Sequence, residues 1–492
     1  MSGKTLVKAI VLILLTVGVE AMASNTAENM TSKNKVAEKI ESNLLPIHYL
    51  KGHVTKKSIP QVMLQDKIAG VSIVFIDDGK IAWRKVYGYA DLVKLEKVTP
   101  ETVFTGASLS KPIAAITALQ LVDQGQLELD EDVNLKLESW KVPESDLTKK
   151  QKVTLRHLIG HTAGVMNLVG SSYGTEEKIP TVAQMLAGEA PSVDPAITMM
   201  AEPGERYKYS NPGYYIIEQL IQDVTDKSFE EIVEEGVLSP ANMKDSSFVQ
   251  PIPEYLKKRK AIGYSNELQP YPYKIFPWRA AGGIWTTPDD LAKFMNALMN
   301  DYHEGSNVLV SKKMAQQIFA RTENRLGFTK KYSDEGNDLI FDHWGSNAGF
   351  TSYMVGSLED KQGLVVMTNS DNGFALMAAI ARAVAQEYDW KLLKPKVYEP
   401  VSIDEDSLAR YLGKFGDGKE DGAVSQFSIK DGKFYLSSEV EKLGQELIPI
   451  AINKFILPSE YTTYEFIQGR DGSIKWVRVT HESGWNYDLI KY

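Results

Sequence analysis

Phe104-Thr-Gly-Ala-Ser-Leu-Ser-Lys111 is the stretch that decides how the rest of the chain is interpreted. It places Ser108 and Lys111 three residues apart, and residues at that spacing lie on one face of a helix, about 5–6 Å apart at Cβ. A lysine shielded from water loses its proton more easily, because burial disfavours the charged form. A neutral amine can accept the proton of a serine hydroxyl as the serine attacks a carbonyl. The pattern therefore predicts a serine hydrolase site with Ser108 as nucleophile and Lys111 as its partner.

Two further motifs follow this stretch along the chain. They are Tyr209-Ser-Asn211 and His343-Trp-Gly345. With all three motifs in order, the chain resembles the penicillin-recognising serine hydrolases, specifically the class C β-lactamase-like branch, which carries Ser-x-x-Lys, then Tyr-x-Asn, then Lys/His-x-Gly. The segments Leu155–Gly164 and Ala280–Leu291 resemble the same family, and the resemblance covers about residues 45–390.

The resemblance implies roles for the residues of the second motif. Tyr209 would be the second member of the proton relay, with tyrosinate character favoured by the nearby ammonium of Lys111. Asn211 would offer its amide to a substrate carbonyl and accept a hydrogen bond from Lys111. The residues do not decide whether Lys111 or Tyr209 is the base, so both assignments stay open. Ser110 faces elsewhere by helical spacing and is expected to be structural.

The third motif is expected on a strand that flanks the site. By the same resemblance, the backbone N–H of Ser346 joins that of Ser108 as an oxyanion hole. Gly345 leaves room for the acyl group, because it has no side chain. The motif departs from the Lys-Thr-Gly of β-lactamases, because His343 is mostly neutral at pH 7 and Trp344 replaces a hydroxyl residue. Both changes weaken the recognition of a substrate carboxylate and therefore favour an esterase or peptidase. Trp344 itself is either an ordinary strand aromatic or a substrate contact.

The order of the predicted elements indicates an α/β fold, with helices on both faces of a mainly antiparallel sheet. Strands at 68–76 and 81–87 are joined by an Asp-Gly turn, and the apolar run at 112–122 is expected to be a buried helix that begins close to Ser108. Further helices are expected at 214–223, 289–298 and 375–387, and further strands at 350–355 and 363–368. The resemblance implies a β-lactamase/transpeptidase-like fold with an all-helical insert between the first and third motifs.

Five segments are predicted along the chain. They are a signal peptide (1–23), an N-terminal spacer (24–44), a β-lactamase-like hydrolase domain (45–390), a linker with prolines (391–407) and a C-terminal antiparallel β domain (408–492). The last segment has short alternating strands and two hairpin signals, Asp431-Gly432 and Asp471-Gly472. These favour a small β-barrel or curled sheet. The segment resembles the lipocalin-like appendage found after many β-lactamase-like hydrolases.

The N-terminus and the composition predict an exported protein. Lys4 and Lys8 precede an apolar run at 9–19, and Ala21-Met-Ala23 is a small-x-small cleavage site. We therefore expect a periplasmic or secreted protein, cut after Ala23, with no stable membrane anchor after cleavage. None of the 492 residues is cysteine, which excludes a thiol nucleophile, a disulfide and a lipoprotein anchor. The formal charge is −9, and removing the two lysines and one glutamate of 1–23 makes it −10, which disfavours nucleic acid as a partner.

Two other motifs are decoys. Gly170-Ser-Ser-Tyr-Gly174 matches the Gly-x-Ser-x-Gly pattern of a nucleophile elbow but lacks the flanking strand and helix. His157 and His161 have the spacing of a zinc helix, but Leu158 occupies the place of the general-base glutamate. No metal and no cofactor are therefore expected.

The sequence predicts a serine hydrolase that forms an acyl-enzyme at Ser108 and releases it with water. The expected partner is a small-molecule or peptide substrate, either an ester, a small amide or a D-amino-acid peptide. One alternative is a class C-type β-lactamase or a D,D-carboxypeptidase, which a lysine at His343 would have favoured. An alternative of another class is a penicillin-binding or sensor module without turnover, against which the three intact motifs argue.

Overall fold

The computed structural model describes residues 31–322, 325–334, 338–416, 418, 424–438, 444–482 and 486–492. The predicted signal peptide (1–23) and the start of the predicted spacer lie outside the described residues. Within the described ranges, no helix combines the length and the apolar character needed to cross a membrane. Backbone contacts divide the chain into two compact units, one built on Pro60–Met377 and the other on Val36–Ile59 with Ala378–Tyr492.

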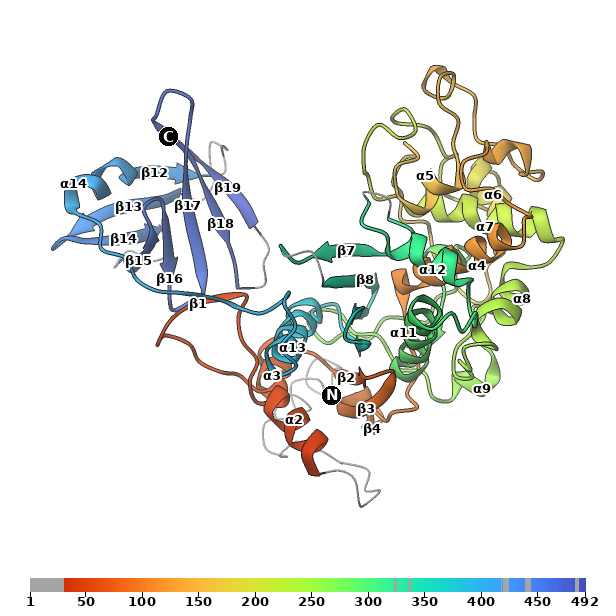
Figure 1. Cartoon of the computed structure of the whole chain (residues 1–492), viewed down its shortest axis with the longest axis horizontal. Helices are drawn as coiled ribbons and strands as arrows, with labels where there is room; N and C mark the ends of the chain where they lie inside the picture. The colour runs from red at the N-terminus through yellow and green to blue at the C-terminus, as the bar shows by residue number, and fades with distance from the viewer. Residues whose placement is uncertain are drawn as a thin grey trace. The chain divides into compact units, whose positions relative to one another are not determined.

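The first unit is organised around a seven-stranded antiparallel sheet (Figure 1). In spatial order its strands are β4 (Glu96–Lys97), β3 (Lys80–Asp91), β2 (Gly70–Asp77), β10 (Gln362–Thr368), β9 (Phe350–Ser357), β8 (Leu339–Asn347) and β7 (Thr329–Tyr332). The central strands β2, β9 and β10 are buried along nearly their whole length, which explains their continuous apolar runs. The predicted Asp-Gly turn is confirmed, since Asp78 and Gly79 have φ of +49° and +68°, as a type I′ turn requires.

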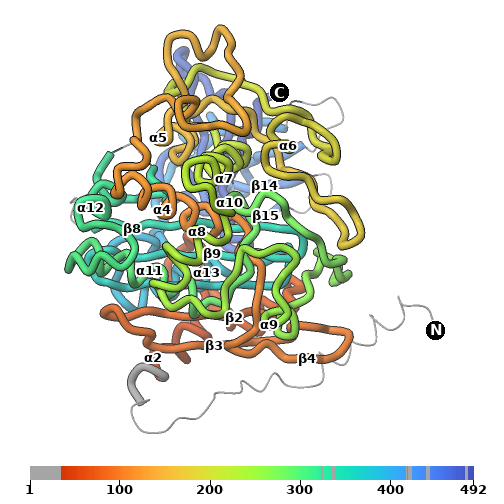
Figure 2. Tube along the Cα trace, turned by 90° about the vertical axis from the view of Figure 1, so that its right-hand side faces the viewer, coloured from red at the N-terminus to blue at the C-terminus, as the bar shows by residue number. Residues whose placement is uncertain are grey.

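Helices make up most of the remaining regular structure of the first unit, beside the short strand pair of β5 (Phe104–Thr105) and β6 (Trp285–Thr286). The α-helices are α3 (Ile59–Gln65), α4 (Ser110–Asp123), α5 (Leu155–Ile159), α6 (Val182–Ala187), α7 (Asn211–Thr225), α8 (Phe229–Val233), α9 (Glu254–Lys257), α10 (Arg279–Gly282), α11 (Pro288–His303) and α12 (Lys312–Phe319). The helix α4 is apolar all round and almost wholly buried. It lies beside α7 and α10 (Figure 2), while α11 packs on β2 and β10. The predicted helix that begins close to Ser108 is therefore confirmed.

The second unit contains a closed, antiparallel, eight-stranded barrel. Its strands are β12 (Gly413–Gly416), β13 (Val424–Lys430), β14 (Lys433–Ser438), β15 (Gln445–Ala451), β16 (Lys454–Leu457), β17 (Thr462–Gln468), β18 (Ile474–Thr480) and β19 (Asn486–Lys491). Each strand pairs with the next, and β19 closes the barrel on β12. Aromatic side chains, among them Phe427, Phe455 and Phe466, fill the interior. The predicted small β-barrel is confirmed, and its described interior is a packed core.

The two units divide the chain differently from the predicted domain boundaries. Residues 45–59 and 378–390 were expected in the hydrolase domain and 391–407 as a linker, but all three are grouped with the barrel. The reason is a parallel pair of strands, β1 (His48–Leu50) and β11 (Lys396–Tyr398), which packs on Ile450 and Ile456 of the barrel. The helix α13 (Phe374–Glu387) runs across the division. Strand pairing between segments so distant in the sequence produces no local pattern of residues, so the sequence did not predict it.

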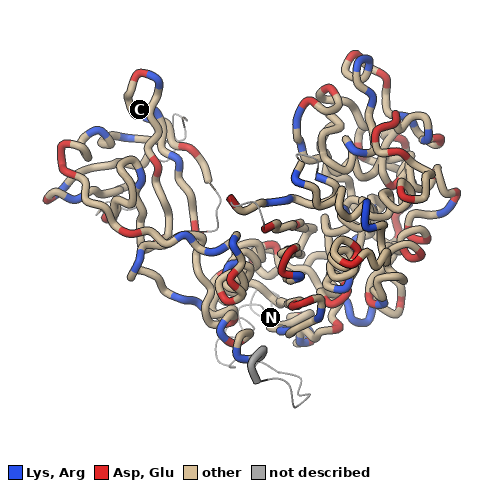
Figure 3. The backbone as a smooth tube through the Cα atoms, viewed as in Figure 1, with Lys and Arg blue, Asp and Glu red and all other residues tan. Residues whose placement is uncertain are grey.

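Charged residues of both signs are interspersed along the described parts of both units (Figure 3). Many of them form ion pairs near the surface, such as Arg84 with Asp289 at 2.7 Å and Arg478 with Asp488 at 2.9 Å. Pairs of this kind contribute at most about 1 kcal/mol each. The stability of the fold therefore rests mainly on its apolar cores.

Candidate active site

Ser108 lies in the single turn that leads into α4. This 3₁₀ turn, η1 (Ala107–Leu109), is followed directly by Ser110, the first residue of α4. Ala107 has a φ of +49°, which is strained for a residue with a side chain. The buried hydroxyl of Ser110 holds the turn, because it donates to the Ala107 carbonyl at 2.7 Å and accepts from the Ile284 N–H at 3.1 Å. Ser110 is structural, as predicted, and the turn presents Ser108 to the site.

Lys111 is fully buried with its amine against the serine. Its Nζ lies 2.9 Å from Ser108 Oγ and donates a hydrogen bond to the carbonyl oxygen of Ala281 at 2.6 Å. The rings of Tyr209 and Tyr214 lie 5.0 and 5.6 Å from this nitrogen. Burial lowers the pKa of Lys111 well below its ordinary value, because the ammonium form loses its hydration. The neutral amine has one lone pair, and the Ser108 hydroxyl is placed to donate to it.

Tyr209 contacts the same serine hydroxyl. Its O–H donates to Ser108 Oγ at 3.0 Å. Burial raises the pKa of Tyr209 to about 12, so the phenol stays protonated at neutral pH. The expected tyrosinate character is therefore not supported, because a neutral Lys111 supplies no positive charge to stabilise a phenolate. Of the two assignments left open by the sequence, the geometry favours Lys111 as the base and Tyr209 as a hydrogen-bond donor.

The His161 ring packs against the ring of Tyr209, a contact that the sequence analysis missed. The helix α5 ends at Ile159, so His161 does not share a helical face with His157, whose backbone and side chain instead cap α5 with Thr154. His161 Nδ1 accepts a hydrogen bond from the Ser210 N–H at 3.2 Å. Burial lowers the pKa of His161 well below its ordinary value, so the ring is neutral. The only signal in the sequence was its place in a segment that resembles the family.

Asn211 is the first residue of α7, which Ser210 caps by accepting from the Gly213 N–H at 3.2 Å. The Asn211 side chain borders the cavity beside Ser108. Its predicted hydrogen bond with Lys111 is not among the described contacts of that amine, which are with Ser108 and the Ala281 carbonyl. The carbonyl comes from α10, a helix that sequence spacing does not place beside the lysine.

The third motif lies on β8 where the strand passes the turn that holds Ser108. β7 pairs only with the first half of β8, so the second half lies beside the site. A Cβ added to Gly345 would lie 2.4 Å from the Gly106 carbonyl oxygen and 3.2 Å from the Ser108 nitrogen. A glycine is therefore needed for this close approach. Ser346 follows on the strand and borders the cavity, where the predicted second oxyanion donor would lie.

His343 and Trp344 differ in what they contact. His343 Nδ1 lies 2.8 Å from the Trp344 carbonyl oxygen. A carbonyl only accepts, so this nitrogen carries the hydrogen and Nε2 is the acceptor. Burial lowers the pKa of His343 to about 3, so the ring is a neutral group. Trp344 stacks on Tyr353, with ring centroids 3.6 Å apart, and also borders the cavity. Trp344 is therefore a packed strand aromatic, and its predicted contact with a substrate stays a prediction.

These side chains surround a cavity of about 410 Å³. Its lining includes exposed apolar side chains, since Val169 is 73%, Tyr207 46% and Phe374 41% exposed. None of the described lining residues is an aspartate or glutamate, and Arg325 adds a guanidinium 4.0 Å from the ring centroid of Tyr207. Arg325 was not predicted, because it stands in a loop before β7 without any motif around it. The cavity suits a substrate with an apolar part and no net positive charge.

Neither decoy motif forms the kind of site that its pattern suggests. The serine of the Gly-x-Ser-x-Gly pattern is Ser172, and the described chain around Gly170–Gly174 has neither a strand directly before it nor a helix directly after it, as a nucleophile elbow requires. Among the residues with described positions, no group of three or more His, Cys, Asp or Glu side chains could hold a metal ion.

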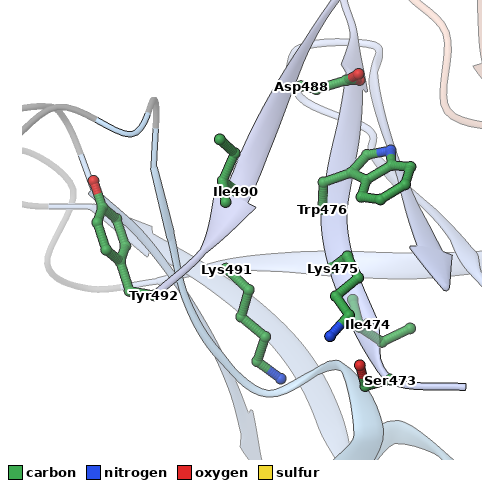
Figure 4. Close-up of a pocket in the computed structure, with 8 residues that line it drawn as sticks. All are labelled: Ser473, Ile474, Lys475, Trp476, Asp488, Ile490, Lys491 and Tyr492. Atoms are coloured by element: carbon green, nitrogen blue, oxygen red, sulfur yellow. The ribbon is translucent and has the colours of Figure 1, made fainter. Parts of the chain in front are cut away.

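A second hollow lies on the barrel, beside β18 and β19 (Figure 4). Its lining includes Trp476, Ile490 and Tyr492 together with Lys475 and Lys491. Lys475 is paired with a neighbouring carboxylate at 2.9 Å. No serine–lysine pair like that of the first unit is described here, so the chemistry is assigned to the cavity around Ser108.

Known proteins are similar in sequence to this chain. Penicillin-binding protein 4* of Bacillus subtilis (strain 168) is 23% identical over 452 residues, which cover 85% of this chain and 94% of that protein. Protein flp of Staphylococcus aureus (strain MW2) is 25% identical over 325 residues, covering 62% of this chain and 61% of that protein.

Solved structures show the same fold. The octameric penicillin-binding protein homologue from Pyrococcus abyssi has a TM-score of 0.58 at 24% identity and covers 87% of this chain and 97% of its own. The D-amino acid amidase from Ochrobactrum anthropi SV3 has a TM-score of 0.56 at 20% identity and covers 73% of this chain and 100% of its own. The family model described as Beta-lactamase matches residues 52–388. The resemblance predicted from the three motifs is thus confirmed, and this chain belongs to the beta-lactamase family of serine hydrolases.

Proposed function

We propose that the protein hydrolyses esters, small amides or D-amino-acid peptides through an acyl-enzyme at Ser108. The observation that carries this proposal is the position of the Ser108 hydroxyl, 2.9 Å from the buried amine of Lys111 and 3.0 Å from the phenol of Tyr209. Such an arrangement activates a serine without a histidine, because the neutral amine accepts the proton that the serine loses.

The first half of the reaction uses this network in a fixed direction. As Ser108 Oγ attacks the carbonyl carbon, its proton moves to Lys111 Nζ, and the carbonyl oxygen becomes an oxyanion. The N–H groups of Ser108 and Ser346 would hold that oxyanion, and removing one such donor typically costs about 2.7–4 kcal/mol of transition-state stabilisation. The bond between the carbonyl carbon and the leaving group then breaks. Tyr209 donates its proton to the leaving group and takes the proton of Lys111, which leaves the acyl-enzyme at Ser108. Water repeats these steps in the second half and frees the acid.

The lining of the cavity supports an apolar substrate part beside the scissile bond. Its exposed aromatic and aliphatic side chains offer that contact, and Arg325 would attract a carboxylate on the substrate. The D-amino acid amidase and the penicillin-binding proteins named above have similar folds, which supports the proposed substrate range. The neutral His343 weakens one carboxylate anchor, and this favours esters and amides over β-lactams. We also propose export, on the strength of the apolar run at 9–19 and the cleavage site at Ala23.

Labelling and turnover, measured on the same preparation, test the proposal. Purified protein from residue 24 onward is treated with a fluorescent phosphonate and a fluorescent penicillin, beside the Ser108→Ala variant. Hydrolysis is followed with an aryl ester, a D-Ala-D-Ala peptide and a chromogenic cephalosporin. We expect labelling at Ser108 and turnover of the ester or the peptide, with both lost in Ser108→Ala. Labelling without turnover would overturn the hydrolase proposal and favour a binding or sensor module.

A further inference from the structure

The short segment from Arg279 to Ile284 connects the base with the turn of the nucleophile. The Ala281 carbonyl accepts the hydrogen bond of Lys111 Nζ at 2.6 Å. Three residues later, the Ile284 carbonyl accepts from the Gly106 N–H at 2.9 Å, in the turn just before Ser108. The position of this segment therefore affects both reacting groups.

A buried carboxylate holds the start of the segment. Glu218, on α7, is completely buried, and its Oε2 accepts a hydrogen bond from the Ala280 N–H at 2.8 Å. Its Oε1 lies 3.4 Å from Arg279 Nη1, and Arg279 Nε forms an ion pair with Glu230 of α8 at 3.3 Å. A carboxylate is costly to bury unless it is paired and hydrogen-bonded. The partners of the Glu218 carboxylate are one guanidinium, that of Arg279, and one backbone N–H, that of Ala280. Ala280 directly precedes Ala281, whose carbonyl binds Lys111.

Resting on the function proposed above, we propose that Glu218 is a positioning residue for Lys111. Its carboxylate fixes the Ala280 N–H and thereby the direction of the Ala281 carbonyl. That carbonyl takes one N–H of the neutral amine, so the lone pair of the amine is directed to the Ser108 hydroxyl. Without this anchor the amine can turn, and the proton of Ser108 loses its acceptor.

The same carboxylate makes the positioning depend on pH. Burial raises the pKa of Glu218 to about 7, and Glu230 contributes in the same direction, while Arg279 and the Ala280 N–H oppose them. Tyr215, the fourth group that faces this carboxylate, is itself buried, and its pKa is raised above the usual range. Above about pH 7 the ionised carboxylate accepts from both donors. Below about pH 7 the protonated carboxyl is a poorer acceptor, so its hydrogen bond with the Ala280 N–H of α10 weakens.

Three variants separate positioning from simple stability. Glu218→Ala removes the anchor, and Glu218→Gln keeps an acceptor for the Ala280 N–H but cannot ionise. Glu230→Gln is the matched control, because Glu230 shares Arg279 but does not contact Ala280. Each is measured with the aryl ester from pH 5 to 9 and by the rate of phosphonate labelling, with circular dichroism and thermal melting to establish folding.

At pH 8 we expect Glu218→Ala to acylate about 100-fold more slowly with an unchanged KM, since misplacing a reacting group by about 1 Å has an effect of this size. The acylation rate of Glu218→Gln at pH 8 should stay within about tenfold of the wild-type rate. The acid limb of its kcat/KM profile should show one protonation step instead of two, because the step of Glu218 is missing. Glu230→Gln should keep both protonation steps and the wild-type acylation rate at pH 8, with the step of Glu218 moved to lower pH because one charge that raises its pKa is removed.

Two results would overturn the inference. One is a pH profile of Glu218→Gln that superimposes on the wild-type profile, and the other is a folded Glu218→Ala that acylates at the wild-type rate. If Glu218→Ala does not fold, the Glu218→Gln profile alone decides. Wild-type protein that is not labelled at Ser108 would instead overturn the proposed function itself.

Discussion

The imidazole of His161 packs against the phenol ring of Tyr209, with the two ring centroids 4.3 Å apart. This contact orients the phenol whose O–H reaches Ser108. We predict that His161→Asn lowers kcat toward the ester by up to about 100-fold and leaves KM unchanged. Asparagine suits the test, because it tolerates the φ of +57° at this position and keeps an acceptor for the Ser210 N–H.

Steady-state kinetics from pH 5 to 8 provide the measurement for His161→Asn. Since burial lowers the pKa of His161 well below its ordinary value, the ring is neutral near pH 7, and around that pH the variant and the wild type should have pH profiles of the same shape. A variant with wild-type kcat would show that the ring contact does not position Tyr209.

Lys111 and Tyr209 should behave as one proton relay. We predict that Lys111→Ala and Tyr209→Phe each lower kcat steeply and that the double variant is no slower than the slower single one, because both act on the same Ser108 hydroxyl. Additive losses in the double variant would contradict a shared network.

The protonation states of this relay also predict the pH dependence of the wild type. Lys111 must be neutral to accept a proton, so kcat/KM falls at acid pH as its lowered pKa is approached. Tyr209 keeps its proton until its pKa of about 12. We therefore expect activity that rises with pH and shows no alkaline decline below about pH 10. A profile that peaks near neutrality and falls by pH 9 would point to a different donor.

Gly345 should not tolerate even a methyl group. A Cβ there would lie 2.2 Å from Ser352 Oγ and 2.4 Å from the Gly106 carbonyl oxygen. We predict that Gly345→Ala lowers stability by about 1–3 kcal/mol, as overpacking does, and sharply lowers the acylation rate by moving the turn of Ser108. Adding Ser352→Ala should restore only part of the loss, since the backbone contact remains. Thermal melting and labelling rates measure both effects, and a Gly345→Ala variant with wild-type values would be inconsistent with this packing.

Residues 343 and 344 are predicted to set substrate preference. The paired change His343→Lys and Trp344→Thr should raise kcat/KM for the cephalosporin relative to the neutral ester, because it restores groups that bind a carboxylate. Arg325→Ala should shift the ratio the other way. The ratio of the two kcat/KM values is the readout, and an unchanged ratio in all variants would mean that carboxylate anchors here do not set specificity.

The sequence by itself determined much of the chemistry and the local elements. Ser108 and Lys111 were predicted from their spacing, and a helix face brings such neighbours together in any fold. The strands with alternating or continuous apolar residues and the Asp-Gly turns were also predicted correctly, since each depends on the chemistry of neighbouring residues. The three motifs indicated the family that the comparison over residues 52–388 shows.

Only the tertiary structure decided how distant segments meet. Lys111 binds the Ala281 carbonyl, whereas the sequence had suggested Asn211 as its partner. His161 belongs to a motif that was dismissed as a zinc pattern, yet its ring packs against Tyr209. Arg325 borders the cavity although it stands in a loop without a motif. Burial, which the packed fold alone sets, makes Lys111 a neutral amine and keeps Tyr209 a protonated phenol. Contacts and desolvation of this kind depend on the arrangement of whole elements in space, and no local pattern of residues records them.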